Sequence, residues 1–254
     1  MKSRLEDLAS RAINKYVWKT ARNTLAISGP PVVSFTFDDV PDTALTQGAA
    51  ILERYGAHGT FYLAGSLMGT EERYRRLIDA EGARELARRG HEIGCHTYAH
   101  RHSWALSPWG MRRDLEQNRT MLKAEGISAR TTNFAFPYNA MSPLARPGLR
   151  RRFRSCRAGG EAINRGSFDP VSLKGVEIRQ PEDYARSLTR WIDDLVAQPG
   201  WLVFFTHDVT DFPTPYGCKP DTLERLVSHA VAKGCDILTV DAAMDRFDRP
   251  AKAA

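Results

Sequence analysis

Apolar residues along this chain of 254 residues follow two alternating patterns, short continuous runs and longer stretches of helical periodicity. The run at 32–37 is rich in β-branched and aromatic residues and is bounded by prolines, which predicts a buried strand. The run at 201–206 has the same character. Further strands are expected at 60–63, 92–94, 133–136 and 236–240 with a short segment at 154–157, and helices near 43–55, 71–89, 108–125, 143–152, 181–197 and 220–233.

The alternation of strands and helices predicts an α/β fold with a parallel sheet. About seven such units suit a closed or nearly closed barrel better than an open sheet. No internal repeat or low-complexity tract divides the chain, and a hydrophobic content of 42% suffices for one full core. We therefore expect residues 25–254 to form a single domain.

Residues 1–24 form a separate segment in this interpretation, because their apolar positions recur at helical spacing among basic residues. Such an amphipathic, basic helix either covers one end of the barrel or lies on an anionic membrane surface. No stretch has the apolar length of a signal peptide or of a membrane span of about 20 residues. We expect a cytoplasmic protein, in peripheral contact with a membrane at most.

The charge and the cysteines change this picture little. The formal net charge of +6 comes largely from an arginine-rich stretch, which either attracts an anionic substrate or membrane or is simply a solvated helix face. Cysteines at 95, 156, 218 and 235 show no paired spacing, so we expect reduced thiols. The arginines concerned are Arg146, Arg150, Arg151, Arg152, Arg154 and Arg157.

Candidate chemistry gathers where predicted strands end. His96 and His100 are four residues apart, so on a helical turn both imidazoles would project from one face and converge on one cation. A third ligand must come from elsewhere, and Asp38 and Asp39 follow the first strand directly. Adjacent strand residues point to opposite faces, so both acids share one cleft only if the strand pleat breaks down there. Active sites of parallel α/β folds lie at these strand ends.

Four motifs follow one another along the chain. They are Thr36-Phe37-Asp38-Asp39, His96-Thr97-Tyr98-Ala99-His100, Phe134-Ala135-Phe136-Pro137-Tyr138 and Phe205-Thr206-His207. In order and spacing they resemble the motifs of the polysaccharide deacetylase family, carbohydrate esterase family 4, over nearly the whole chain from about residue 30. The resemblance implies a distorted (β/α) barrel over residues 25–254 that holds one divalent metal ion, usually zinc. It also implies removal of acetyl groups from N-acetylated sugars.

By the same resemblance, Asp39, His96 and His100 match metal ligands, Asp38 the catalytic base and His207 the catalytic acid. A divalent cation with open coordination positions polarises an amide carbonyl and activates water near neutral pH. Asp38 would take the proton of that water, a backbone N–H near Tyr138 would hold the oxyanion, and His207 would protonate the departing amine. Tyr216, in a rigid turn beyond His207, either stacks on a sugar ring or only shapes its loop.

The chain departs from the family pattern at Ala135, where many members have an arginine that positions the base. Arg157 is the candidate replacement, the alternative being a plain surface arginine. Asp169 is available for the family's acidic fourth motif, although an Asp-Pro pair also predicts a turn. We assign no role to the remaining histidines, which are His58, His91, His102 and His229.

Three functions therefore stay open: a metal-dependent sugar N-deacetylase, a hydrolase of small or cyclic amides on the same scaffold, and a carbohydrate-binding protein without turnover. The His-His-carboxylate set also suits ferrous iron, although the adjacent acid Asp38 favours hydrolysis. We expect an N-acetylated carbohydrate or glycan precursor as partner and no nucleic acid. The sequence leaves the oligomeric state open.

Overall fold

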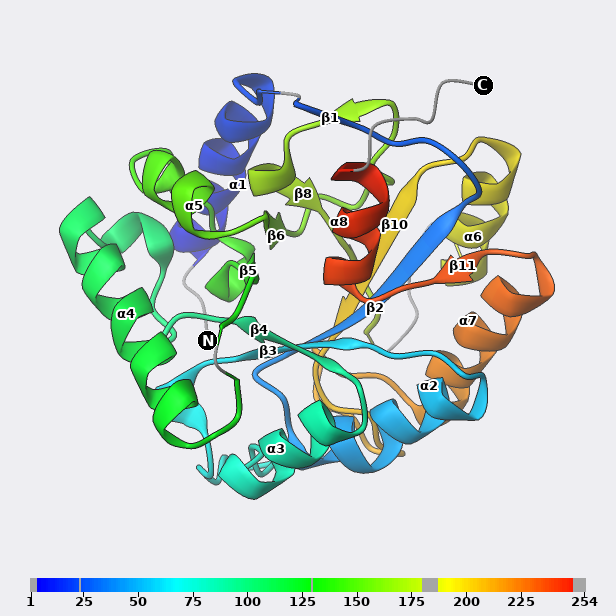
Figure 1. Ribbon diagram of the computed structural model, residues 1–254, viewed down its shortest axis with the longest axis horizontal. Coiled ribbons are helices and arrows are strands. Elements are labelled where there is room, and N and C mark those ends of the chain that lie inside the picture. The colour runs from blue at the N-terminus through cyan, green and yellow to red at the C-terminus, as the bar shows by residue number, and fades with distance from the viewer. Residues whose placement is uncertain (1–3, 23, 129, 180–186, 249–254) are drawn as a thin grey trace.

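The centre of the molecule is a parallel sheet built on the two strands that the sequence predicts most clearly. The computed structural model describes residues 4–22, 24–128, 130–179 and 187–248. Strands β2 (Val32–Asp38) and β10 (Trp201–Thr206) are buried along their whole length and pair in parallel. Phe35 and Phe204 stack on each other with ring centroids 5.6 Å apart. Both expected strands are confirmed, and they run side by side through the middle of Figure 1.

The sheet closes almost completely into a barrel. Its hydrogen-bonded path runs from β8 through β6, β5, β4, β3, β2 and β10 to β9, with β11 also paired to β2. Only Gly175 separates β8 (Leu173–Lys174) from β9 (Val176–Glu177), so one short segment supplies both ends of the path. The expected distorted (β/α) barrel is confirmed, and the described residues contribute nine strands to this sheet. The others are β3 (Thr60–Leu63), β4 (Glu92–Cys95), β5 (Asn133–Ala135), β6 (Ser155–Ala158) and β11 (Asp236–Ile237), and β1 (Leu25–Ala26) pairs separately with β7 (Ser167–Phe168).

Helices surround the strands, as Figure 1 shows, and their apolar faces complete the core. Among the described residues, no helix combines the length and the apolar character needed to cross a bilayer. The principal helices are α1 (Arg4–Lys19), α2 (Ala50–Arg54), α3 (Ala80–Arg88), α4 (Pro108–Ala124), α5 (Arg146–Arg152), α6 (Leu188–Ala197), α7 (Pro220–Ala232) and α8 (Val240–Asp248). Short helical turns lie at Ala44–Ala49, Gly65–Leu67, Ser103–Ala105, Pro137–Asn139 and Pro170–Ser172.

Several expected elements are shorter than their patterns suggested, and in two of them a hydrogen bond explains the difference. The helix expected at 71–89 begins only at Ala80, because the side chain of Asp79 caps it by accepting a hydrogen bond from the Gly82 N–H at 2.9 Å. The strand expected at 236–240 ends at Ile237, since the Val240 N–H donates to Thr60 Oγ1 and starts α8 instead. The first part of the helix expected at 181–197 lies outside the described residues.

Helix α1 packs on the segment that follows β5. Asn14 donates through Nδ2 to the carbonyl of Asn139 at 2.7 Å and accepts through Oδ1 from the Met141 N–H at 2.9 Å. Val17 is buried in the neighbouring apolar cluster, and the Trp18 indole donates to the Ser172 carbonyl. The helix therefore covers this part of the barrel, as one of the two sequence interpretations expected.

The arginine-rich stretch at 146–157 is mostly paired inside the molecule. Arg146 and Arg150 both bind Asp169. Arg152 pairs with Glu116, and Arg154 pairs with three aspartates in α8. Most of this positive charge is therefore already compensated, which weakens the expectation that the stretch attracts an anionic substrate.

Candidate metal centre

The two adjacent acids at the end of β2 both lie near His96 and His207, because the strand ends at the first of them. Asp39 and Val40 have φ angles of 59° and 55°, in the left-handed region. The Val40 N–H donates back to the Asp38 carbonyl at 2.6 Å. This tight reversal breaks the pleat, and both carboxylates are buried, with exposures of 3% for Asp38 and 6% for Asp39. The expected breakdown of the pleat is confirmed.

The histidine pair converges for a different reason from the one predicted. Residues 96–100 form an irregular loop after β4 rather than a helical turn, and Thr97 and His100 have φ angles of 65° and 47°. The two imidazole rings nevertheless lie 5.0 Å apart. Asp114 of α4 holds this loop by accepting hydrogen bonds from the N–H groups of Tyr98 (2.7 Å) and Ala99 (3.1 Å).

Asp39, His96 and His100 form a set that fits one divalent cation. Their candidate ligand atoms all lie within 4.8 Å of one another. Oδ1 of Asp39 lies 3.0 Å from Nε2 of His100 and 3.7 Å from Nε2 of His96, close to the ~3.0–3.4 Å between ligands that each stand about 2.1 Å from one ion. The same Oδ1 is buried and has no hydrogen-bond partner with acceptable geometry, so a cation would satisfy it.

The protonation states suit ligation. Burial lowers the pKa of His96 to about 4, so its ring is neutral near pH 7. Nδ1 of His96 lies 2.8 Å from the Ala135 carbonyl and donates to it, which leaves Nε2 as a lone-pair donor facing Asp39. Burial raises the pKa of Asp39, but the imidazoles of His100, His207 and His96 hold it well below its ordinary value.

Arg157 holds the second acid, as the sequence suggested. Its guanidinium forms a short ion pair with Oδ1 of Asp38, and both side chains are buried. A second nitrogen donates to Asn139 Oδ1 at 2.8 Å, and the Phe205 ring centroid lies 4.5 Å from the guanidinium carbon. Burial raises the pKa of Asp38, but Arg157 foremost, with His96 and His207, brings it below its ordinary value. Asp38 is therefore an ionised carboxylate with a fixed orientation.

His207 and Tyr138 lie beside the same cluster. Nε2 of His207 is 3.9 Å from Oδ2 of Asp39, while Nδ1 lies 3.2 Å from the Tyr216 carbonyl. The Tyr138 ring centroid is 4.6 Å from that of His100, in a turn where Tyr138 itself has a φ angle of 58°. All seven residues singled out from the sequence therefore converge on one rim of the barrel: Asp38, Asp39, His96, His100, Tyr138, Arg157 and His207.

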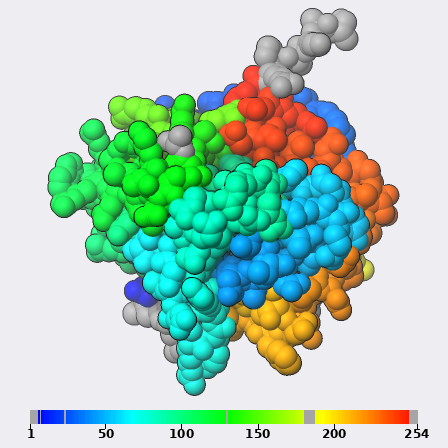
Figure 2. Space-filling model, turned by 60° about the horizontal axis from the view of Figure 1, so that its bottom comes forward, coloured from blue at the N-terminus to red at the C-terminus, as the bar shows by residue number. Residues whose placement is uncertain are grey.

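Sequence reasoning missed Arg75. Its NH2 group donates to Oδ2 of Asp39 at 2.9 Å, and its Nε donates to Glu72 at 2.6 Å. The residue lies between β3 and α3, in a segment that Figure 2 shows in cyan, projecting from the surface. The sequence had predicted a helix there, and a lone arginine in a helix gives no signal of a contact with a carboxylate 36 positions away. Arg75 therefore belongs to the surroundings of the candidate ligand Asp39.

His102, to which we assigned no role from the sequence, also lies beside this cluster. The ring of His102 stacks on Tyr138 with centroids 4.2 Å apart.

Asp169 does not belong to the candidate metal centre. It caps the turn that it begins by accepting a hydrogen bond from the Val171 N–H, and it binds Arg146 and Arg150. The alternative interpretation of its Asp-Pro pair as a turn is therefore confirmed.

Comparison with known proteins agrees with this geometry. The family model described as polysaccharide deacetylase matches residues 27–151. This chain belongs to that family. The resemblance drawn from the motifs is thereby confirmed, and the match includes the acids after β2 and both histidines of the loop after β4.

Solved structures with this fold include members of carbohydrate esterase family 4. The Xyl-CE4 domain of a multidomain xylanase from the hindgut metagenome of Trinervitermes trinervoides has a TM-score of 0.59 at 16% identity, covering 89% of this chain and 95% of that one. A family 4 acetyl xylan esterase from Clostridium thermocellum, in complex with a cobalt ion, has a TM-score of 0.58 at 19% identity, covering 86% and 93%. A family 4 pseudoenzyme from Bacillus anthracis has a TM-score of 0.60 at 14% identity, covering 85% and 66%. At these identities the likeness establishes the fold of this chain and nothing further.

Proposed function

We propose that this polysaccharide deacetylase is a metal-dependent hydrolase that removes N-acetyl groups from an acetylated sugar or glycan precursor. The observation that carries the proposal is the pairing of a three-residue cation site with a separate, ionised acid beside it. Asp39, His96 and His100 offer three ligand atoms, while Arg157 holds Asp38 apart. Three protein ligands leave coordination positions for water and substrate, as in catalytic zinc sites. Zinc is the metal we propose.

The roles of the residues follow from where they lie. A cation bound by the triad supplies Lewis acidity, which polarises the acetyl carbonyl and lowers the pKa of water. Asp38 accepts a proton from the attacking water, since its carboxylate is ionised and oriented by Arg157. His207 donates a proton to the departing amine through Nε2, because its Nδ1 faces the Tyr216 carbonyl. A backbone N–H in the turn at Tyr138 would hold the developing oxyanion.

Arg157 also weakens the proposal of a binding protein without turnover. The sequence favoured that alternative only because Ala135 replaces the positioning arginine of the family. The ion pair between Arg157 and Asp38 supplies the missing positive charge at the base. Hydrolysis of a small or cyclic amide remains the second candidate chemistry, since the same base and acid would serve it.

The test is acetate release from a panel of substrates by metal-free and metal-loaded protein. We expect release from N-acetylated oligosaccharides to need added metal and to fall at least a hundredfold in Asp38→Asn, the loss typical of a missing general base. O-acetylated xylan and small cyclic amides complete the panel. Metal-loaded protein that releases acetate only from the ester, or that hydrolyses only the small amides, would overturn the proposed substrate class.

The cellular location also remains a proposal. We infer a cytoplasmic protein, because all four cysteines are free thiols buried in the structure. Contact between α1 and an anionic membrane surface is the alternative, and exposed Leu8 and Tyr16 are its available apolar side chains. Fractionation of cells that express the full chain, with and without a high-salt wash, separates these two locations.

A further inference from the structure

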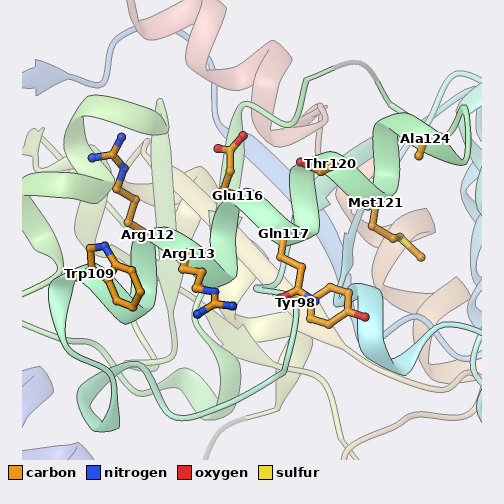
Figure 3. A pocket seen from close by; sticks show the side chains of 9 residues that line it. All are labelled: Tyr98, Trp109, Arg112, Arg113, Glu116, Gln117, Thr120, Met121 and Ala124. Carbon is orange, nitrogen blue, oxygen red and sulfur yellow. The ribbon is translucent and has the colours of Figure 1, made fainter.

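A groove on the outer surface of α4 contains none of the residues of the metal centre. Its volume is about 850 Å³. Figure 3 shows Trp109, Arg113, Gln117 and Tyr98 along one side of the helix, with Arg112 and Glu116 on the other edge. Spacing by four residues places Trp109, Arg113 and Gln117 in one row along α4. The complete lining is Tyr98, Trp109, Arg112, Arg113, Glu116, Gln117, Thr120, Met121 and Ala124.

The aromatic and basic side chains of this groove are available to a ligand. Trp109 is 69% exposed, which is unusual for an indole that serves only packing. The guanidinium of Arg113 lies 5.8 Å from the centroid of the Trp109 ring. Within the described part of the chain, neither Arg112 nor Arg113 pairs with a carboxylate. The groove therefore presents a flat apolar surface next to two uncompensated positive charges.

The acid in the groove does not cancel these charges. Both oxygens of Glu116 are already engaged, Oε1 by Arg119 and Oε2 by Arg152 at 2.7 Å. By contrast, arginines elsewhere on the surface, such as Arg88 and Arg154, have carboxylate partners. The unpaired charge of Arg112 and Arg113 thus marks the groove as a place for an anionic partner.

We propose that this groove binds an acidic oligosaccharide, with a sugar ring on Trp109 and a uronic-type carboxylate on Arg113 or Arg112. The indole would cover the apolar face of a pyranose ring, and guanidinium groups bind carboxylates through paired hydrogen bonds. Gln117 and Thr120 offer donors and acceptors to sugar hydroxyls. The row from Trp109 to Gln117 spans eight residues, about 12 Å of helix, which accommodates a chain of sugars rather than one ring.

The groove also borders the loop that carries the metal ligands. Tyr98, which lines the groove, lies between His96 and His100 in the chain. Asp114, next to Arg113 in α4, binds the Tyr98 N–H. A glycan in the groove would therefore lie along the outer side of the loop of residues 96–100. The choice of a glycan rests on the proposed function, whereas the charge and the exposed indole are independent of it.

The experiment is calorimetric titration of the full chain with oligogalacturonate and with a neutral cello-oligosaccharide of equal length. We expect the acidic chain to bind more tightly and its affinity to fall with added salt. Trp109→Ala should lose about tenfold in affinity and Trp109→Phe much less, because a phenyl ring still stacks. Arg113→Gln should lose about fivefold. The matched control is Lys123→Gln, which removes the same charge from an exposed position of α4 outside the groove.

Several results would overturn the proposal. Equal affinity for the acidic and neutral chains, no binding of the acidic chain, or equal losses in Arg113→Gln and Lys123→Gln each contradict it. Tighter binding of single-stranded DNA than of oligogalacturonate would also do so, since nucleic acids use similar aromatic and basic surfaces. Acetate release from a short N-acetylated substrate should be unchanged in Trp109→Ala. That release tests the proposed function separately from the groove.

Discussion

The arginine that serves Asp38 comes from a different strand than in the family pattern, and the sheet register explains why this works. Ala135 of β5 stands directly opposite Arg157 of β6 in the parallel ladder. Residues in register on neighbouring strands project their side chains to the same face. An arginine at either position can therefore approach the carboxylate at the end of β2. Sequence order alone conceals this equivalence, because the two positions are 22 apart in the chain.

The first prediction concerns the arginine Arg157. In Arg157→Ala, burial acts on Asp38 without its main opposing charge, so the pKa of Asp38 should rise. We expect turnover to fall about a hundredfold and the acidic limb of the pH profile to move to higher pH, since the base then protonates earlier. The double variant Ala135→Arg with Arg157→Ala should recover part of the lost turnover, and its acidic limb should return part of the way to its original pH. Full turnover with an unshifted acidic limb in the single variant would refute the role of Arg157.

The second prediction concerns Arg75. By donating to Oδ2 of Asp39, it leaves Oδ1 as the oxygen that faces His96 and His100. In Arg75→Met the carboxylate can offer both oxygens to one ion, which favours cations that accept many oxygen ligands. We expect the ratio of zinc to manganese affinity, measured by competition titration, to fall about tenfold. Arg73→Met, at an exposed position of the same segment, is the control, and an equal ratio in both variants would contradict this role.

At the scale of elements, the loop of residues 96–100 after β4 is held by contacts with α4 and not by the hydrogen bonds of a helical turn. The backbone N–H groups of Tyr98 and Ala99 both point at Asp114, and His100 donates through its N–H to Thr97 Oγ1 at 3.1 Å. Left-handed residues in the loop are costly in isolation, so these contacts stabilise the conformation that brings the imidazoles together.

The third prediction concerns the hydrogen bonds that Asp114 accepts from this loop. Asp114→Ala removes two charge-assisted hydrogen bonds and should lower the free energy of unfolding by about 2–3 kcal/mol. We expect metal affinity to fall about tenfold as well, because the loop then populates conformations in which His100 turns away. Asp114→Asn keeps one acceptor oxygen, so its free energy of unfolding and its metal affinity should lie between those of the native protein and of Asp114→Ala. Unchanged metal affinity in Asp114→Ala would show that the loop holds its shape without α4.

The elements themselves were predictable where one local pattern decided them. The apolar runs of β2 and β10 and the long periodicity of α4 identified these elements correctly. Helix α8 was not predicted at all, because Val240 suits a strand and its role as the first residue of a helix depends on the long-range hydrogen bond from its N–H to Thr60. For the site, residue types and motif order pointed to seven residues that the structure places near one another, whereas their roles stay predictions. Arg75 could not be found in this way, since its contact with Asp39 depends on how a surface segment folds back.

At the scale of the whole molecule, Asp169 joins parts of the chain that the sequence assigned to different segments. Its buried carboxylate accepts from the Arg22 N–H at 2.9 Å, and from Arg146 and Arg150 of α5 at 2.6 and 2.7 Å. Residues 4–22 are therefore held to the barrel by the hydrogen bond from the Arg22 N–H to this carboxylate, as well as by the apolar side of α1. The N-terminal segment and the barrel should consequently unfold together.

The last prediction tests this connection through its pH dependence. Burial raises the pKa of Asp169, but Arg22, Arg146 and Arg150 hold it below its ordinary value, so folding favours the ionised form. That stabilisation is complete above the unfolded pKa of about 3.9 and is lost as the pH falls through the lower folded value. Asp169→Asn should therefore lower the free energy of unfolding at pH 7 by about 2 kcal/mol. The difference from the native protein should shrink below about pH 4, because the unfolded chain then takes up a proton that the native carboxylate still resists. Denaturant titration at pH 7, 4 and 3 measures this difference, with Asp221→Asn, at an exposed position of α7, as control. A difference that stays constant across that range would mean that the charge of Asp169 does not stabilise the fold.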